Sequence, residues 1–323
     1  IMTSRIKDML GVQFPIFQAP MGSVTNTKLI AAVANAGCVG MHAVSWDTPD
    51  EIDTLFAATR AASDGVFGAN LVLEWDQQER LDTLIANECK LVSFFWGDPA
   101  PYLDKAKANG MITMLTVGTA AEARHAADIG VDIVVAQGWE AGGHVWSNVS
   151  TLALVPAIAK KVAEIPVVAA GGIGSGRAMA AALALGAEAV WVGTRFLASA
   201  EALAHPGYKD LLVDADESST AHGFMFDGGW PDAAHRVLKS RVVDMALSGE
   251  EKDRALIGRL PTGGEMRRFD DYPPTVGMTG AWEETALYAG QSVGQIDAIK
   301  SIDAIVTEML DDAREALQSV SAF

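Results

Sequence analysis

Short apolar runs, many of them β-branched, alternate along the first two thirds of the chain with longer amphipathic or alanine-rich stretches. Runs of this length and composition predict buried strands, and the intervening periodicity predicts helices. The predicted strands are residues 16–19, 39–41, 66–71, 91–94, 113–117, 133–136, 167–170 and 189–192. The predicted helices are residues 27–35, 49–62, 77–87, 101–109, 120–129, 152–162 and 175–185.

This regular alternation determines the predicted fold class. Strands that are apolar throughout belong to parallel sheets covered by helices on their faces. Eight strands within roughly 200 residues favour a closed (β/α)8 TIM barrel, an α/β fold. An open doubly wound sheet is the alternative, but no GxGxxG motif follows the first predicted strand.

The alternation of predicted strands and helices ends near residue 205. Residues 209–284 are expected to form a smaller, mostly helical lobe inserted after the eighth strand, with a charged helix near 237–257. Residues 296–317 show one apolar face at helical spacing and predict a long helix that returns to cover the barrel. The predicted domains are therefore a barrel of residues 1–208 and 285–323, and a lid lobe of residues 209–284.

Candidate functional residues lie where the predicted strands end, because active sites of these barrels are built there. Two glycine-containing turns follow the seventh and eighth strands, at Gly171-Gly172 and Gly193-Thr194. Glycine lets the main chain approach an anion closely, so the paired turns predict a phosphate site. The alternative is that these glycines only make tight turns.

One histidine stands out from the six in the chain. His144 ends the loop after the sixth predicted strand, beside the predicted phosphate site, and is suited to act as a general base or hydrogen-bond donor. His42 ends the second strand and either lines the pocket or packs in the core. The spacing of the six histidines predicts no metal site.

Composition narrows the class of partner. Half of the residues are hydrophobic, a fifth are charged, and the formal net charge is −17. Such an excess of acid argues against nucleic acid and anionic membranes as partners, and leaves a small-molecule substrate. Cys38 and Cys89 are expected to be buried free thiols, and no apolar run approaches the roughly 18–20 residues that span a bilayer. We therefore expect a cytoplasmic protein without a signal peptide, with a homodimer left open.

Several motifs taken together resemble the nitronate monooxygenase (2-nitropropane dioxygenase) family, which includes related flavin-dependent enoyl reductases. The motifs are Gln18-Ala-Pro-Met-Gly22, Ala136-Gln-Gly-Trp-Glu-Ala-Gly-Gly-His144, Ala169-Ala-Gly-Gly-Ile173, Val192-Gly-Thr-Arg-Phe196 and Tyr288-Ala-Gly-Gln-Ser-Val-Gly294. They are spread over nearly the whole chain.

This resemblance implies FMN as the cofactor and His144 as the catalytic residue. The FMN phosphate would bind at Gly171, Gly172, Gly193 and Thr194, and the isoalloxazine near Ala19, Pro20, Met21 and Gly22. The remaining implied cofactor contacts are Asn70, Thr116, Gln137, Gly142, Gly143 and Gln291. The sequence departs from the family pattern at Trp146, where many relatives have glycine, and at Met41-His42. A bulky Trp146 is expected to narrow the substrate pocket.

The leading functional interpretation is FMN-dependent oxidation of alkyl nitronates by O2, giving carbonyl compounds and nitrite. An NAD(P)H-dependent flavin reductase of quinones or enoyl thioesters is the closest alternative. A lyase or isomerase acting on a sugar phosphate is a third, although such barrels carry a lysine or paired carboxylates at strand ends and this one carries neither. A binding module without turnover is the fourth.

Overall fold

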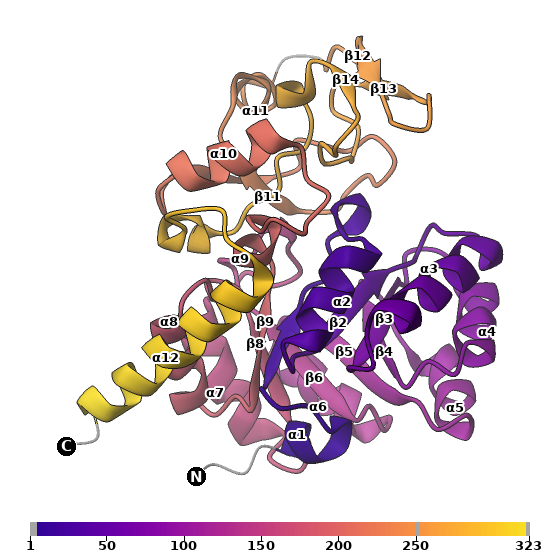
Figure 1. Ribbon diagram of the computed structural model, residues 1–323, viewed down its shortest axis with the longest axis vertical. Coiled ribbons are helices and arrows are strands. Elements are labelled where there is room, and N and C mark those ends of the chain that lie inside the picture. Colours follow the sequence, from indigo (N-terminus) through magenta and orange to yellow (C-terminus); the bar gives the residue numbers. More distant parts are fainter. Residues whose placement is uncertain (1–4, 250–251, 321–323) are drawn as a thin grey trace.

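Eight parallel strands curl into a barrel in the computed structural model, which describes residues 5–249 and 252–320. Their order around the barrel is β1-β9-β8-β6-β5-β4-β3-β2. Val39 bridges to Phe17 in β1, and the main-chain N–H of Gln18 donates to the Val39 carbonyl at 2.9 Å, which joins the two edges. The predicted (β/α)8 barrel is therefore confirmed (Figure 1). The barrel strands are β1 (Ile16–Gln18), β2 (Gly40–Ala43), β3 (Phe67–Val72), β4 (Leu91–Phe95), β5 (Ile112–Val117), β6 (Ile133–Gln137), β8 (Val167–Ala170) and β9 (Ala189–Val192).

Helices cover the outside of this sheet. They are α2 (Thr27–Asn35), α3 (Pro49–Ala62), α4 (Gln78–Ala86), α5 (Ala100–Ala108), α6 (Ala120–Asp128), α7 (Thr151–Lys161), α8 (Gly176–Ala184) and the short α9 (Thr194–Leu197), preceded by α1 (Arg5–Leu10) and the 3-10 turn η1 (Gly22–Val24). Polar side chains cap the N-termini of several of these helices. At α3, for example, Thr48 and Glu51 form a reciprocal capping box before the helix, with Pro49 in its first turn.

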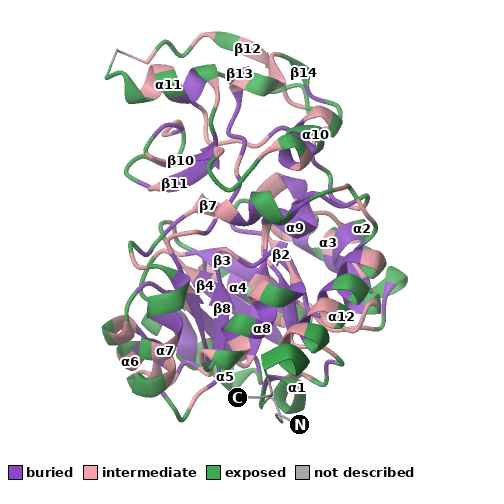
Figure 2. Cartoon of the chain, turned by 90° about the vertical axis from the view of Figure 1, so that its left-hand side faces the viewer, coloured by how far each residue is buried: buried purple, intermediate pink, exposed green. Residues whose placement is uncertain are grey.

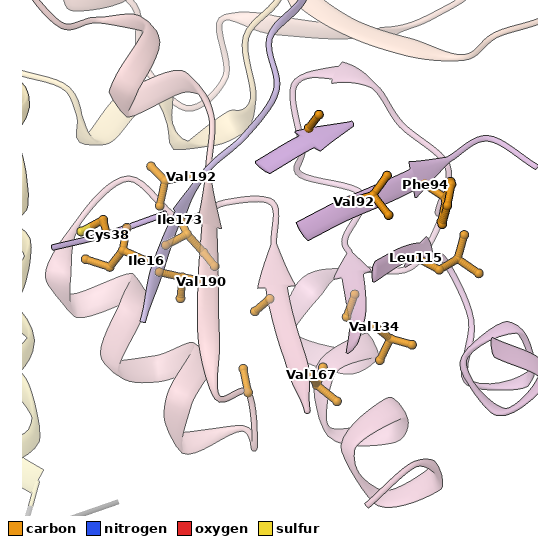
Figure 3. Close-up of a cluster of buried hydrophobic side chains, with 14 of the residues drawn as sticks. Ile16, Cys38, Val92, Phe94, Leu115, Val134, Val167, Ile173, Val190 and Val192 are labelled. Carbon is orange, nitrogen blue, oxygen red and sulfur yellow. The ribbon is translucent and has the colours of Figure 1, made fainter. Parts of the chain in front are cut away.

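Side chains on successive strand positions enter two different apolar layers. Phe17, Met41, Leu91 and Met114 fill the barrel interior. Neighbouring positions such as Ile16, Val92 and Val190 point outward to the helices, as Figure 3 shows for the outer layer. This double burial explains why the strands are apolar throughout. Buried residues accordingly run through the sheet while exposed residues lie on the outer helices (Figure 2).

The segment after the barrel strands differs from the prediction. It contains α10 (Pro206–Asp214), β10 (Thr220–Gly223), β11 (His235–Leu238), α11 (Arg241–Leu247), β12 (Leu256–Arg259), β13 (Glu265–Arg267), β14 (Thr279–Gly280) and the 3-10 turn η2 (Trp282–Glu284). The lobe is thus mixed rather than mostly helical, and the helix predicted near 237–257 is limited to α11. Strand β11 pairs with β10 and with β7 (Gly143–His144), which lies in the loop after β6. Because β7 lies far from β11 in the sequence, no local pattern of polar and apolar residues predicts their pairing. The domain boundaries at 209 and 284 stay a prediction.

The chain returns to the barrel through the 3-10 turn η3 (Gln291–Gln295) and helix α12 (Ile302–Val320). The helix begins six residues later than predicted, where Ser301 accepts a hydrogen bond from the main chain of Ala304. It packs closely on α8, because a Cβ atom added at Gly176 would lie 2.1 Å from the Met309 carbonyl oxygen. Among the described residues, no helix combines the length and apolar character needed to cross a bilayer.

Candidate active site

A cavity of about 720 Å³ opens where the barrel strands end, beneath the lobe. Residues at or just after the ends of all eight barrel strands contribute to it, which is the site expected for this architecture. The predicted residues that line it are Ala19, Pro20, Met21, Gly22, Asn70, Thr116, Gln137, Gly142, Gly143, His144, Gly171, Gly172, Gly193 and Thr194. Gln291 does not line the cavity; its main-chain N–H donates to the Glu140 carbonyl, and its neighbours Gly290 and Ser292 line the cavity instead.

The two glycine turns form one end of the cavity. Gly171 and Gly172 have φ angles of +100° and +74°, conformations that favour glycine. A Cβ atom added at Gly193 would have only the Ala19 Cβ within 4 Å, at 3.6 Å, so the space beside this turn is open. Thr194 is fixed there by the main-chain N–H of Gly290, which donates to its hydroxyl at 2.9 Å. No lysine or arginine of the described chain lines the cavity, so an anion bound here would rely on main-chain N–H groups.

His144 presents an unused nitrogen to this cavity. Its side chain is 11% exposed, and Nε2 has no hydrogen-bond partner among the described residues. The imidazole packs against Trp230, with ring centroids 3.9 Å apart. Burial, and then the nearby His235, lower the pKa of His144 to about 3. The ring is therefore neutral near pH 7.

Asp271 is the functional candidate that sequence reasoning missed. Its Oδ2 lies 3.5 Å from Nε2 of His144, and its Oδ1 accepts a hydrogen bond from the Tyr288 hydroxyl. Burial raises the pKa of Asp271 to about 6, against the effect of the Tyr288 hydrogen bond. Because His144 is neutral, this contact is not an ion pair. The only signal in the sequence was Tyr288 itself, which opens one of the family-like motifs.

Gln137 holds the His144 loop in place. Its Nε2 donates to the His144 carbonyl at 3.0 Å, and its Oε1 accepts from the main-chain N–H of Trp146 at 2.8 Å. One side chain at the end of β6 thus satisfies main-chain groups on both sides of residue 145. This arrangement fixes the position of the histidine relative to the barrel.

Trp146 does not narrow the pocket as expected. Its side chain is absent from the cavity wall, packs against Trp96 and donates from Nε1 to the Glu122 carboxylate at 2.9 Å. The bulky ring beside His144 is instead Trp230, supplied by the lobe. This exchange of one tryptophan for another could not be predicted from the sequence, because it depends on how the lobe docks.

His42 both lines the cavity and packs in the core, the two alternatives predicted for it. It lines the cavity, and it is also 2% exposed, stacked on Phe56 and bonded through Nε2 to the Thr59 hydroxyl at 2.9 Å. Burial lowers the pKa of His42 to about 4. It is therefore a neutral wall residue rather than a charged one.

This combination of barrel, glycine turns and buried histidine defines a flavin-dependent oxidoreductase. The chain belongs to the nitronate monooxygenase family, whose model, described as "Nitronate monooxygenase", matches residues 3–80 and 72–312.

The individual relatives carry different names. A probable nitronate monooxygenase of Staphylococcus aureus is 29% identical, with 98% of each chain covered. A (3aS,4S,5R,7aS)-5-hydroxy-7a-methyl-1-oxo-octahydro-1H-indene-4-carboxyl-CoA dehydrogenase of Rhodococcus jostii is 35% identical over 74% of this chain and 66% of its own. The structure of FabK from Thermotoga maritima superimposes with a TM-score of 0.86 at 30% identity, covering 100% of this chain and 99% of that one.

Proposed function

We propose that this protein binds FMN and oxidises alkyl nitronates with O2 to carbonyl compounds and nitrite. The observation that carries the proposal is the free Nε2 of His144, buried in a cavity beside glycine turns suited to a phosphate. Membership of the nitronate monooxygenase family supports it.

The cavity fits FMN at its glycine end. Gly171, Gly172, Gly193 and Thr194 would hold the phosphate, with open space beside Gly193 that a side chain would fill. The predicted ring contacts, Ala19–Gly22 together with Asn70 and Gln137, line the same cavity. FMN, when bound, supplies the ring system that accepts electrons from the substrate.

His144 has the properties of a base for substrates that arrive as neutral nitroalkanes. Its uncharged Nε2 can take the proton from the carbon beside the nitro group only when the imidazolium is stabilised, because a pKa of about 3 alone makes the ring a weak base. The imidazolium so formed would lie 3.5 Å from the Asp271 carboxylate, and this opposite charge would stabilise it. For a nitronate that is already deprotonated, the imidazole positions the nitro oxygens.

The test is turnover of ethyl nitronate by the purified holoenzyme and by His144→Ala. We expect the variant to keep its flavin absorbance, because the imidazole is not part of the phosphate turns. Its kcat on neutral nitroethane, assayed in parallel, should fall by roughly 10² to 10⁴-fold, the usual contribution of a proton-transfer residue, and its turnover of ethyl nitronate should fall less, through lost positioning. Unchanged turnover in His144→Ala, or a wild-type protein that does not consume O2 with any nitronate, contradicts the proposal.

A second candidate is an NAD(P)H-dependent reductase or dehydrogenase acting on a larger substrate. The specific observation in its favour is the aromatic wall of the cavity, formed by Trp46, Trp75 and Trp230, which exceeds what a two-carbon substrate requires. The relatives named as a carboxyl-CoA dehydrogenase and as FabK point the same way. Anaerobic mixing distinguishes the two: flavin bleaching by NADH or NADPH that is faster than bleaching by ethyl nitronate favours the second candidate.

A further inference from the structure

Three tryptophans form a continuous aromatic wall on one side of the cavity. The ring centroids of Trp46 and Trp75 are 5.5 Å apart, those of Trp75 and Trp230 5.2 Å, and those of Trp46 and Trp230 6.3 Å. All three pairs meet edge to face, the geometry that aromatic rings prefer. Since each ring is braced by the other two, the wall is rigid.

The wall runs from the reacting histidine to the protein surface. Trp230, which is 2% exposed, lies against His144, whereas Trp46 is 52% exposed. Trp46 follows β2 and Trp75 follows β3, and β3 is four strands away from β8 around the barrel. The wall is therefore on the side of the cavity opposite the Gly171-Gly172 turn, where a substrate rather than the cofactor phosphate would lie.

The charges around the wall select against anions. Apart from tyrosines, the ionisable side chains that line the cavity, within the part of the chain that the structure describes, are acidic or histidine: Asp47, Glu140 and Asp271, with His42 and His144. Asp47 directly follows Trp46; burial and the charge of Glu51 raise the pKa of its carboxyl to about 6, against the opposing charge of Arg80, so it is mostly ionised near pH 7. A carboxylate or phosphate on the ligand would meet negative potential here, and an uncharged group would not.

We propose that this tryptophan wall is a binding subsite for a flat, uncharged ring carried by the substrate. The preferred substrates would be arylalkyl nitro compounds rather than short-chain nitroalkanes. Trp46, Trp75 and Trp230 would contact the ring while the reacting carbon faces His144. The substrate class rests on the proposed function, whereas the ring subsite itself does not require turnover.

The kinetic test compares kcat/KM for the nitronates of 2-phenylnitroethane and nitroethane. The wild-type holoenzyme is expected to prefer the phenyl compound, and Trp46→Ala should reduce that preference by about fivefold or more, the value of one aromatic contact. Trp146→Ala is the matched control, because Trp146 is also exposed and in the same aromatic cluster but does not line the cavity. It should leave the preference intact. A wild-type preference for nitroethane, or equal losses in the two variants, overturns the subsite.

A binding test separates the subsite from the reaction. Naphthalene-2-carboxamide, which cannot be oxidised as a nitronate, is titrated into the holoenzyme and followed by perturbation of the flavin spectrum, with acetamide for comparison. Tight binding of the naphthyl amide that weakens by about fivefold in Trp46→Ala, but not in Trp146→Ala, supports the subsite even if no nitronate is turned over. In that case the proposed function fails and the subsite stands. No difference between the two amides overturns the subsite whatever the turnover.

Discussion

Oδ2 of Asp271 lies 3.5 Å from Nε2 of His144, although one residue belongs to the inserted segment and the other to the loop after β6. Near pH 7 the carboxyl, with its pKa raised to about 6, is mostly ionised, while the imidazole, with its pKa lowered to about 3, is neutral. A proton that arrives on the imidazole would therefore be stabilised by a charge already in place. This pairing makes the roles of the two residues separable by experiment.

Replacing Asp271 with Asn should mainly impair proton abstraction. Asparagine keeps the size of the side chain and an oxygen for the Tyr288 hydroxyl, but it cannot stabilise an imidazolium. We expect kcat on neutral nitroethane to fall about 10- to 100-fold, and kcat on preformed ethyl nitronate to fall much less. The wild-type rate on nitroethane should rise with pH through about 6, and this limb should be missing in the variant. Equal losses on both substrates would show that Asp271 acts only through structure.

Buried neutral histidines should make the fold sensitive to acid. His42 has a pKa lowered to about 4 by burial, so the unfolded chain binds its proton at a higher pH than the folded one does. This difference in proton binding lowers the free energy of unfolding in acid. The loss is absent above about pH 6.5 and grows as the pH falls toward 4. It amounts to about 2 kcal/mol at pH 5. His42→Gln should therefore lose less stability than the wild type between pH 7 and pH 5, as measured by urea unfolding. An identical pH dependence in the two proteins contradicts this prediction.

The open space beside Gly193 provides a test of the cofactor site. Its φ of −104° is outside the left-handed region, and an added Cβ atom would approach only the Ala19 Cβ. Gly193→Ala should therefore fold, but its methyl group should obstruct the phosphate and weaken FMN binding by roughly tenfold, or about 1.4 kcal/mol. Fluorescence titration of FMN into the apoprotein measures this change. Gly264→Ala, in the β12–β13 turn, is the control and should bind FMN normally. Unaltered FMN affinity in Gly193→Ala would remove this turn from the phosphate site.

Gln137 should control the mobility of the His144 loop. Gln137→Leu removes the hydrogen bonds to the His144 carbonyl and the Trp146 N–H, and leaving these groups unsatisfied should destabilise the loop by about 1–3 kcal/mol. Hydrogen–deuterium exchange of residues 138–147 should increase.

Gln295 offers a matched comparison for this loop. It holds the glycine turn in the same way, donating to the Gly172 carbonyl and accepting from the Gly174 N–H. Gln295→Leu should therefore raise exchange at residues 171–175 and leave residues 138–147 unchanged. If Gln137→Leu does not alter exchange in its own loop, the histidine is positioned by other contacts.

The sequence predicted the features that depend on residues close together in the chain. Helices α2 and α3 lie within the predicted limits, because the capping side chains Asn26 and Thr48 adjoin the segments they begin. The glycine turns and His144 were found for a similar reason, since they directly follow strands whose ends meet at one face.

The missed features all depend on contacts between distant parts of the chain. Asp271 and Trp230 reach His144 only through docking of the inserted segment, and neither lies in a periodic pattern. Residues 237 and 238 of β11 were assigned to a helix because this strand has only four residues and one of its two partners, β7, lies more than ninety positions away. Trp146 was expected to face the pocket because it follows His144 closely in the sequence. Nearness in sequence does not determine on which side of the loop the ring lies.

The pairing of β7 with β11 also has a consequence for how the protein is made. Gly143 and His144 are held by a strand synthesised long after the loop that contains them, and Tyr288, which bonds to Asp271, follows later still. The glycine turns also depend on residues made late, because Gly290 bonds to Thr194 and Gln295 bonds to Gly172 and Gly174. Contacts of such long sequence separation form late in folding. The glycine turns and His144 should consequently become ordered together, once the C-terminal part of the chain has joined the barrel.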